Sequence, residues 1–195
     1  MTSPSPSPPD TAAARRARRT LILIAAAVVA PVALSYFFYY VAPRAAFTNY
    51  GELLPTAPLP DIAGTTIDGR PFRAADLRGT WTILVPAGGA CDAACADALY
   101  ATRQARTMQG KDMDRVARAW IVTDDATPST ARLAEHPGIV VARVDAAEAR
   151  RLPKAGSAPL LVDPLGNVVL AWPARPDPKA LAKDLSRLLK ASRIG

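Results

Sequence analysis

The stretch WTILVPAGGACDAACADALYATRQARTMQ, residues 81–109, decides the fold of this 195-residue chain. Its first five residues form an apolar, β-branched run of the kind found in buried strands. Residues 86–90 interrupt that pattern, and the two glycines among them allow the backbone a tight path. An Ala-rich stretch without Gly or Pro then continues to Gly110, which predicts a helix. The sequence therefore predicts a buried strand that leads through a short loop into a helix.

Both cysteines of the chain, Cys91 and Cys95, lie at this predicted junction. The first turn of a helix offers unpaired N–H groups and the positive end of the helix dipole, and both stabilise a thiolate. The thiolate is the form that attacks disulfides and binds soft metals. The four-residue spacing places both side chains on one helical face, with Cα atoms about 6 Å apart, which is within reach of a disulfide. The same pair offers two ligands to one Cu(I) or Zn ion.

Two considerations modify this interpretation of the cysteine pair. Asp92 lies between the cysteines, and a nearby negative charge disfavours the thiolate. A purely structural disulfide is the alternative, but such bonds gain most when they close long loops, and this loop is short. We therefore interpret the pair as chemical, with a redox or metal role.

The N-terminal residues predict a membrane anchor. Residues 1–20, Pro/Ser-rich and then Arg-rich, are expected to be a disordered cytoplasmic tail. Residues 21–41 carry no charge and are long enough to cross a bilayer as a helix that ends in a cluster of aromatic residues. Four arginines precede this span and only Arg44 follows closely, which predicts a cytoplasmic N-terminus. A cleaved signal peptide is the alternative, but its apolar region would be shorter and a small-residue cleavage site would follow.

Charge and motifs exclude several function classes. The formal net charge is +7, and the first 44 residues contribute +4 of it, so the remaining chain carries only +3. That remainder has no long basic run of the kind that binds nucleic acid. There is no phosphate-binding G-x-x-x-x-G-K-[ST] loop, and a Ser/His/Asp hydrolase would have to use His136, the only histidine. The acidic pair at residues 124–125 is expected to be a solvated loop, since a hard-metal site needs further oxygen ligands.

The rest of the chain predicts one α/β domain. Residues 42–58 are expected to be an extended, Pro-rich linker, and residues 59–195 to be the domain. A hairpin that turns at residues 68–69 and a short helical turn at residues 74–77 precede the central strand. After the cysteine helix we expect strands at residues 119–123, 139–144, 158–162 and 168–172, and helices at residues 130–135, 146–152 and 178–192. This alternation predicts a mostly parallel sheet with helices on both faces, to which the late hairpin adds antiparallel strands.

Three runs carry a family resemblance: DGRPF at residues 68–72, LRGTWTILVPAGGACDAAC at 77–95 and PLLVDPLGNVVL at 159–170. With them the sequence resembles thioredoxin-fold proteins of the redoxin type. The C-x-x-x-C spacing, the anchor and the DP-x-G-N hairpin narrow the resemblance to short, bacterial, membrane-anchored relatives of the SCO/SenC group of cytochrome c oxidase assembly proteins. The resemblance implies a thioredoxin-like fold with an N-terminal β-hairpin extension after a single transmembrane helix. It also implies a helix in the bacterial inner membrane and a domain in the periplasm.

The resemblance also assigns residues. It implies that Cys91 and Cys95 are the copper or redox cysteines, and that Pro159 holds the position of the cis-proline beside them, although a plain strand-start proline also fits. SCO-type copper sites add a histidine shortly before the strand that leads into the DP-x-G hairpin, but residues 152–157 contain none. His136 is expected to be exposed or to end a helix. The remaining soft side chains are Met108 and Met113, which need no metal to explain them.

Three functions remain open, and the first two place the chain in oxidase biogenesis. In thiol–disulfide exchange, Cys91 would attack and Cys95 would resolve the mixed disulfide. The expected partner is an oxidase subunit or a copper chaperone, and this protein would reduce the partner's cysteines. In the second function, the cysteines would carry Cu(I) to the oxidase by ligand exchange. The missing histidine favours exchange, and the family resemblance favours copper. The third is a scaffold that docks a partner without using its cysteines.

Overall fold

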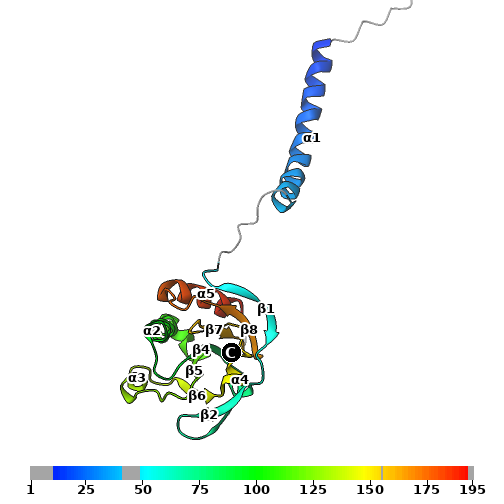
Figure 1. Ribbon diagram of the computed structural model, residues 1–195. Helices are drawn as coiled ribbons and strands as arrows, with labels where there is room; N and C mark the ends of the chain where they lie inside the picture. The colour runs from blue at the N-terminus through cyan, green and yellow to red at the C-terminus, as the bar shows by residue number, and fades with distance from the viewer. Residues whose placement is uncertain (1–10, 41–48, 155, 193–195) are drawn as a thin grey trace, which may run out of the picture. The chain divides into compact units, whose positions relative to one another are not determined.

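The computed structural model describes residues 11–40, 49–154 and 156–192. It divides into two units, Met1–Thr48 and Asn49–Gly195, which are described separately (Figure 1).

The first unit contains the helix α1 (Thr11–Tyr40). Residues 14–38 of this helix are long and apolar enough to cross a membrane, and none of the apolar window is buried. The helix begins well before residue 21, so the prediction of disorder is wrong for residues 11–20. Alanine and arginine are strong helix formers, and an apolar helix that follows them removes the cost of nucleation. The rest of the predicted tail, residues 1–10, and the end of the predicted span at residue 41 lie outside the described residues.

The second unit is an α/β domain built on one mixed sheet, and its thioredoxin-like class was predicted. The strands of the described chain are β1 (Glu52–Pro58), β2 (Ala63–Thr66), β3 (Pro71–Arg73), β4 (Trp81–Ala87), β5 (Val116–Val122), β6 (Val140–Val144), β7 (Leu160–Val162) and β8 (Asn167–Ala171). The helices are η1 (Ala74–Leu77), α2 (Ala93–Thr107), η2 (Gly110–Arg115), α3 (Thr130–Ala134), α4 (Ala146–Ala149) and α5 (Pro178–Ala191). The strand order is β1-β8-β7-β4-β5-β6-β2-β3.

The sheet is less parallel than predicted. Only β4, β5 and β6 pair in parallel with one another in the described chain. The predicted hairpin of β2 and β3 joins one edge through antiparallel pairing of β2 with β6. At the other side β7 pairs antiparallel with β4, and β8 with β7. The alternation of strands and helices therefore describes only the centre of the sheet, because hairpins extend it on both sides.

The strand β1 lies within residues 42–58, which were predicted to be a linker. Residues 52–58 are extended, as their prolines suggested, but they pair antiparallel with β8 at the edge of the sheet. Proline is tolerated in an edge strand because one side of that strand has no hydrogen-bonding neighbour. The pairing shifts register between Leu53 and Ala57, the interval that contains Pro55. The folded unit thus starts at Asn49, ten residues before the predicted boundary, and residues 41–48 of the linker region lie outside the described residues.

A buried carboxylate holds the start of β1 against the domain. Asp184 of α5 is 3 % exposed and accepts hydrogen bonds from the backbone N–H groups of Tyr50 (3.2 Å) and Gly51 (2.8 Å). It also accepts from the indole N–H of Trp172 at 3.2 Å, and Arg187 lies 3.7 Å away. A buried carboxylate needs such partners to offset its desolvation. The start of the second unit is therefore fixed to the last helix of the domain.

β4 is the central strand, and all seven of its residues are buried. Ile83 packs with α2 and α5 on one face, and Leu84 packs with η1 and α4 on the other. Helices thus cover both faces, as predicted. The strand continues through Pro86, where the sequence suggested a break. β7 pairs only with Thr82–Leu84, so at Pro86 the strand has one neighbour, β5, and tolerates a missing N–H.

The strand order of the sheet changes direction at β4. It continues from β4 to β5 and β6 on one side, and returns to β7 and β8 on the other. In open α/β sheets, ligands bind beyond the carboxyl ends of the strands at such a switch point. The carboxyl end of β4 leads directly to Cys91.

Candidate thiol–disulfide site

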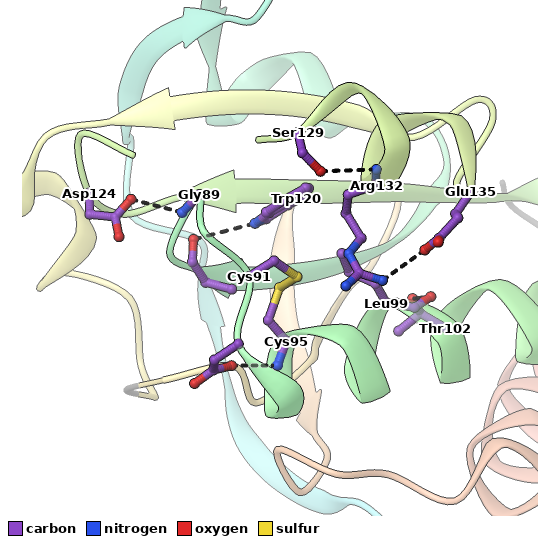
Figure 2. The surroundings of a disulfide bond; sticks show 12 residues. Gly89, Cys91, Cys95, Leu99, Thr102, Trp120, Asp124, Ser129, Arg132 and Glu135 are labelled. Atoms are coloured by element: carbon purple, nitrogen blue, oxygen red, sulfur yellow. Dashed lines mark hydrogen bonds and ion pairs between the residues drawn. A yellow bond between two sulfur atoms is a disulfide. The ribbon is translucent and has the colours of Figure 1, made fainter. Parts of the chain in front are cut away.

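Cys91 and Cys95 form a disulfide, with Cα atoms 5.1 Å apart. Figure 2 shows it between the end of the loop after β4 and the first turn of α2. The prediction that both side chains share one helical face is wrong, because α2 begins only at Ala93. Aspartate is a preferred N-cap, and the Asp92 carboxylate accepts the Cys95 N–H at 2.9 Å. Cys95 therefore lies in the first turn of the helix, and Cys91 lies outside it.

The backbone of Cys91 is in the left-handed region, with φ of +51°. Residues other than glycine reach this region at a cost of about 1 kcal/mol, and they concentrate at functional sites. The Cys91 N–H donates to the Gly88 carbonyl at 3.1 Å, which closes a turn before the helix. This turn brings Cys91 back to within disulfide reach of Cys95 without a helical backbone.

The two sulfurs differ in access. Cys91 is 9 % exposed and Cys95 is 1 % exposed. Both belong to a buried apolar cluster with Val85, Leu99 and Trp120. Cys91 is therefore the more accessible residue of a largely buried pair. This order matches the predicted roles of attacking and resolving cysteine, which themselves stay predictions.

Asp124 holds the loop in front of Cys91. Its Oδ1 accepts the backbone N–H groups of Gly89 at 2.8 Å and Ala126 at 3.1 Å (Figure 2). A Cβ added to Gly89 would lie 1.8 Å from the Ala126 carbonyl oxygen, and one added to Gly88 would lie 2.5 Å from Asp124 Oδ2. Only glycine allows the two loops to approach this closely. Asp124 is exposed, as expected for a solvated acidic loop, but its carboxylate also fixes the neighbouring loop.

A signal for this contact is present in the sequence. Asp124 follows β5 and Gly89 follows β4, and these strands are parallel neighbours. Loops at the carboxyl ends of adjacent parallel strands meet at the same edge of a sheet. Trp120 supports the same edge, because its indole N–H donates to the Ala87 carbonyl at 3.3 Å beside the disulfide (Figure 2).

The other soft or titratable side chains considered from the sequence do not join the cysteines. Met108 caps the far end of α2, about 20 Å along the helix from Cys95 at 1.5 Å per residue. Met113 lies beyond it in η2. In the described residues no three His, Cys, Asp or Glu side chains converge on a possible metal site. The reduced cysteines would offer Cu(I) two thiolates, and none of the three expected candidates is placed to add a third ligand.

His136 is 3 % exposed, so the expectation of an exposed histidine is wrong, although it does follow the end of α3. Its pKa is lowered to about 4, mainly by burial and then by the positive charges of Arg118 and Arg103. Neither ring nitrogen has a hydrogen-bond partner among the described residues. Arg103 lies about 12 Å along α2 from Cys95, which separates this histidine from the disulfide.

Pro159 directly precedes β7, and its carbonyl accepts the Trp172 N–H at 2.9 Å. Leu160 pairs with Leu84 in antiparallel sense, so Pro159 lies toward the carboxyl end of β4, the end that leads to Cys91. No peptide bond in the described chain is cis, so the cis-proline expectation is wrong and the strand-start alternative holds.

A groove of about 510 Å³ lies beside the disulfide, at the carboxyl ends of β4 and β5. Its lining includes Pro86, Asp92, Ala149, Arg150, Leu152 and Lys154. Part of this lining comes from residues 152–157, the segment in which SCO-type proteins place their histidine. Here that segment contributes an apolar side chain and a lysine to the groove.

The family model for the transmembrane-like, thioredoxin-like C-terminal domain matches residues 81–192, more than half of the chain. The chain belongs to this family. The matched residues of this family member run from β4 through the disulfide to the end of α5. No curated protein sequence matches this chain.

Solved structures place the same domain among thioredoxin-like folds. Copper-bound ScoI of Bradyrhizobium japonicum has 22 % identity and a TM-score of 0.55, over 67 % of this chain and 99 % of that one. Copper-bound yeast Sco1 has 20 % identity and a TM-score of 0.60, over 71 % and 96 %. The thioredoxin domain of a Bacteroides vulgatus thiol-disulfide oxidoreductase has 17 % identity and a TM-score of 0.50, over 70 % and 99 %. The predicted likeness to Sco proteins is confirmed at the level of the fold.

We expect the domain to lose stability as the pH falls from about 6.5 to about 4. His136 has a pKa of about 4 in the folded protein and 6.5 in the unfolded chain. Between these two pH values the unfolded chain therefore binds a proton at His136 that the folded protein does not bind, and this favours unfolding. The loss from this residue reaches about 3 kcal/mol, at 1.36 kcal/mol per pKa unit. Urea unfolding at pH 7.5 and pH 4.5 measures it.

The control for this prediction is His136→Phe, which keeps a buried ring and removes both unpaired nitrogens. Carboxylate titration is common to both proteins, so the variant should lose about 2–3 kcal/mol less than the wild type between the two pH values. Equal losses in the two proteins would contradict the assignment.

Proposed function

We propose that this protein is a membrane-anchored thiol–disulfide exchange protein of cytochrome c oxidase biogenesis. Its substrates would be the cysteines of an oxidase copper site or of a copper chaperone. The observation that carries the proposal is a preformed pair of unequal exposure, with Cys91 at the rim and Cys95 buried behind it. The fold neighbours include Sco proteins and a thiol-disulfide oxidoreductase, which support a redox or copper-related role in general.

The proposed exchange moves two electrons between dithiol and disulfide. The Cys91 thiolate attacks one sulfur of the partner's disulfide, and the partner's other sulfur leaves as a thiolate. The Cys95 thiolate then attacks Cys91, which breaks the mixed disulfide and releases the partner's second thiol. The partner is reduced and the Cys91–Cys95 disulfide forms. A further dithiol protein would return the pair to the reduced form by the same steps in reverse.

The N-terminus of α2 assists Cys95 more than Cys91. The first-turn N–H groups and the helix dipole favour negative charge near Cys95. The Asp92 carboxylate already occupies the Cys95 N–H, however, and adds a negative charge beside both sulfurs. We therefore expect only a modest stabilisation of the thiolates, in contrast to strongly oxidising pairs whose thiolate is well stabilised.

We expect single-cysteine variants of the full chain in detergent to behave unequally toward oxidised glutathione. Cys95→Ser should accumulate a glutathione adduct on Cys91, because no second thiol is present to resolve it. Cys91→Ser should form at least tenfold less adduct, because Cys95 is 1 % exposed. Intact mass spectrometry after acid quenching measures both. Equal adducts on the two variants, or none on either, would overturn the exchange mechanism.

Cu(I) delivery is the second candidate function, and the copper-bound Sco structures among the fold neighbours favour it. We expect the reduced full chain to bind Cu(I) through two thiolates only. In competition with a chromogenic Cu(I) chelator, Cys91→Ser or Cys95→Ser should abolish binding, and Met108→Ala, Met113→Ala and His136→Ala should leave it unchanged. No binding by the wild type above the cysteine variants would discard the carrier function. A loss of affinity in a methionine or histidine variant would show a third ligand that the described arrangement does not support.

We also propose that α1 is a single-pass anchor with a cytoplasmic N-terminus and a periplasmic domain in a bacterial inner membrane. The candidate span and the family description fit an anchor. The four arginines before the apolar residues support the orientation. In intact spheroplasts, a membrane-impermeant maleimide should label the reduced cysteines of the wild type. Labelling only after lysis would reverse the proposed topology.

A further inference from the structure

We propose that the groove beside Cys91 binds the polypeptide that flanks the partner's reacting cysteine, and that Arg150 and Lys154 select partners with carboxylate side chains next to that cysteine. This inference rests on the proposed exchange function and specifies its substrate class. The occupant is an acidic segment of polypeptide around a disulfide-bonded cysteine of the partner.

The position of the groove follows from the exchange geometry. A partner sulfur must come within bonding distance of Cys91, so the residues next to it must lie on the surface around Cys91. The groove lining does not include the cysteines themselves, but it includes Asp92, the residue directly after Cys91, and Gly88, three residues before it. Its volume of about 510 Å³ is within the range of ordinary ligand sites and accommodates a few side chains.

The charges of the groove favour an acidic occupant. Arg150 is exposed, and its guanidinium forms no ion pair with any carboxylate in the described part of the chain. Lys154 pairs with Glu52 at 2.9 Å, but 36 % and 66 % of these two side chains are exposed. An exposed pair of this kind is worth little and exchanges readily for another carboxylate. Asp92 is the acidic residue of the lining and accepts the Cys95 N–H, so with Arg150 and Lys154 the lining has two formal positive charges and one negative charge.

Part of the groove lining is apolar. Pro86, near the end of β4, and Leu152, which is 7 % exposed, both line the groove. Apolar and cationic side chains in one lining suit an extended segment that carries an apolar residue beside its cysteine and acidic residues around it. The segment that would hold a histidine in a copper site serves here, in this proposal, to recognise a polypeptide.

The test uses the reduced full chain in detergent and two synthetic peptides. Each peptide contains one internal disulfide, and they differ only in having Glu or Gln on both sides of one cysteine. The rate at which each peptide oxidises the protein is measured by alkylation and mass spectrometry. This rate is divided by the rate at which the same peptide disulfide is reduced by dithiothreitol, which removes differences in intrinsic reactivity between the two peptides. We expect the wild type to prefer the Glu peptide by about fivefold, as two exposed charge contacts allow. High salt should reduce this preference.

Charge variants test whether the preference for the Glu peptide comes from Arg150 and Lys154. Arg150→Gln should reduce it to about twofold, and Arg150→Gln combined with Lys154→Gln should abolish it. Arg150→Glu should favour a Lys peptide of the same design over the Glu peptide. Lys190→Gln removes the same charge from the exposed end of α5 and should leave the preference unchanged. Each variant should react with oxidised dithiothreitol at the wild-type rate, since neither side chain touches the sulfurs in the proposed mechanism.

The outcomes separate the two proposals. Equal rates with the Glu and Gln peptides, while both oxidise the protein, would overturn the acidic selection and leave the exchange function standing. A preference that survives the double variant would also overturn the assignment to this groove. If neither peptide nor oxidised dithiothreitol oxidises the protein, the exchange function fails, and the inference fails with it.

Discussion

The hydrogen bond from the Cys95 N–H to the Asp92 carboxylate, 2.9 Å long, determines where α2 begins, and the rest of the site depends on that point. A helix that started two residues earlier would take Cys91 into its first turn and place both sulfurs on one face. With Asp92 as the cap, Cys91 stays outside the helix in a left-handed conformation. The two cysteines therefore have different backbone environments and different access to solvent. That asymmetry is what an exchange mechanism with an attacking and a resolving sulfur requires.

The cap acts within a rigid frame. β4 is buried along its whole length, and the parallel β5 brings Asp124 to the same edge, where it accepts the Gly89 N–H. The loop that leads into Cys91 is thus held from both ends, by a buried strand and by a carboxylate of the neighbouring loop. We expect a site with this support to keep its geometry when the disulfide opens, because its hydrogen bonds join backbone N–H groups to the carboxylates of Asp92 and Asp124 and do not involve the sulfurs.

The fold is shared with Sco proteins solved with copper, but the described residues offer the cysteines no third soft ligand. The histidine of the chain is buried, and burial together with the charges of Arg118 and Arg103 lowers its pKa to about 4. Residues 152–157 line a groove with an apolar and a positive side chain instead. Fold alone does not assign function, and the difference lies in which side chains surround the same two sulfurs.

Local patterns were sufficient for much of the domain. The β-branched run before the cysteines, the Asp-Gly turn of the first hairpin and the Asp177 cap of α5 depend on neighbours in the chain, so the strand β4, the hairpin of β2 and β3 and the last helix were predicted from residues alone. The thioredoxin-like class and the interest of the C-x-x-x-C pair were also predicted from the sequence, because the spacing of the cysteines and their place after a strand can be read from the order of residues alone.

Only the tertiary structure decided the features that depend on residues far apart. β1 has the composition of a linker and becomes a strand because β8 offers it a free edge. The sequence predicts that His136 is exposed or ends a helix, and only the fold shows that it is buried. Asp124 is exposed as predicted, but it also binds a loop that precedes it by 35 positions. Sequence by itself determined which residues could carry the chemistry. The packing of distant segments decided which of them meet, because burial and long-range hydrogen bonds are properties of the folded chain and not of any local pattern.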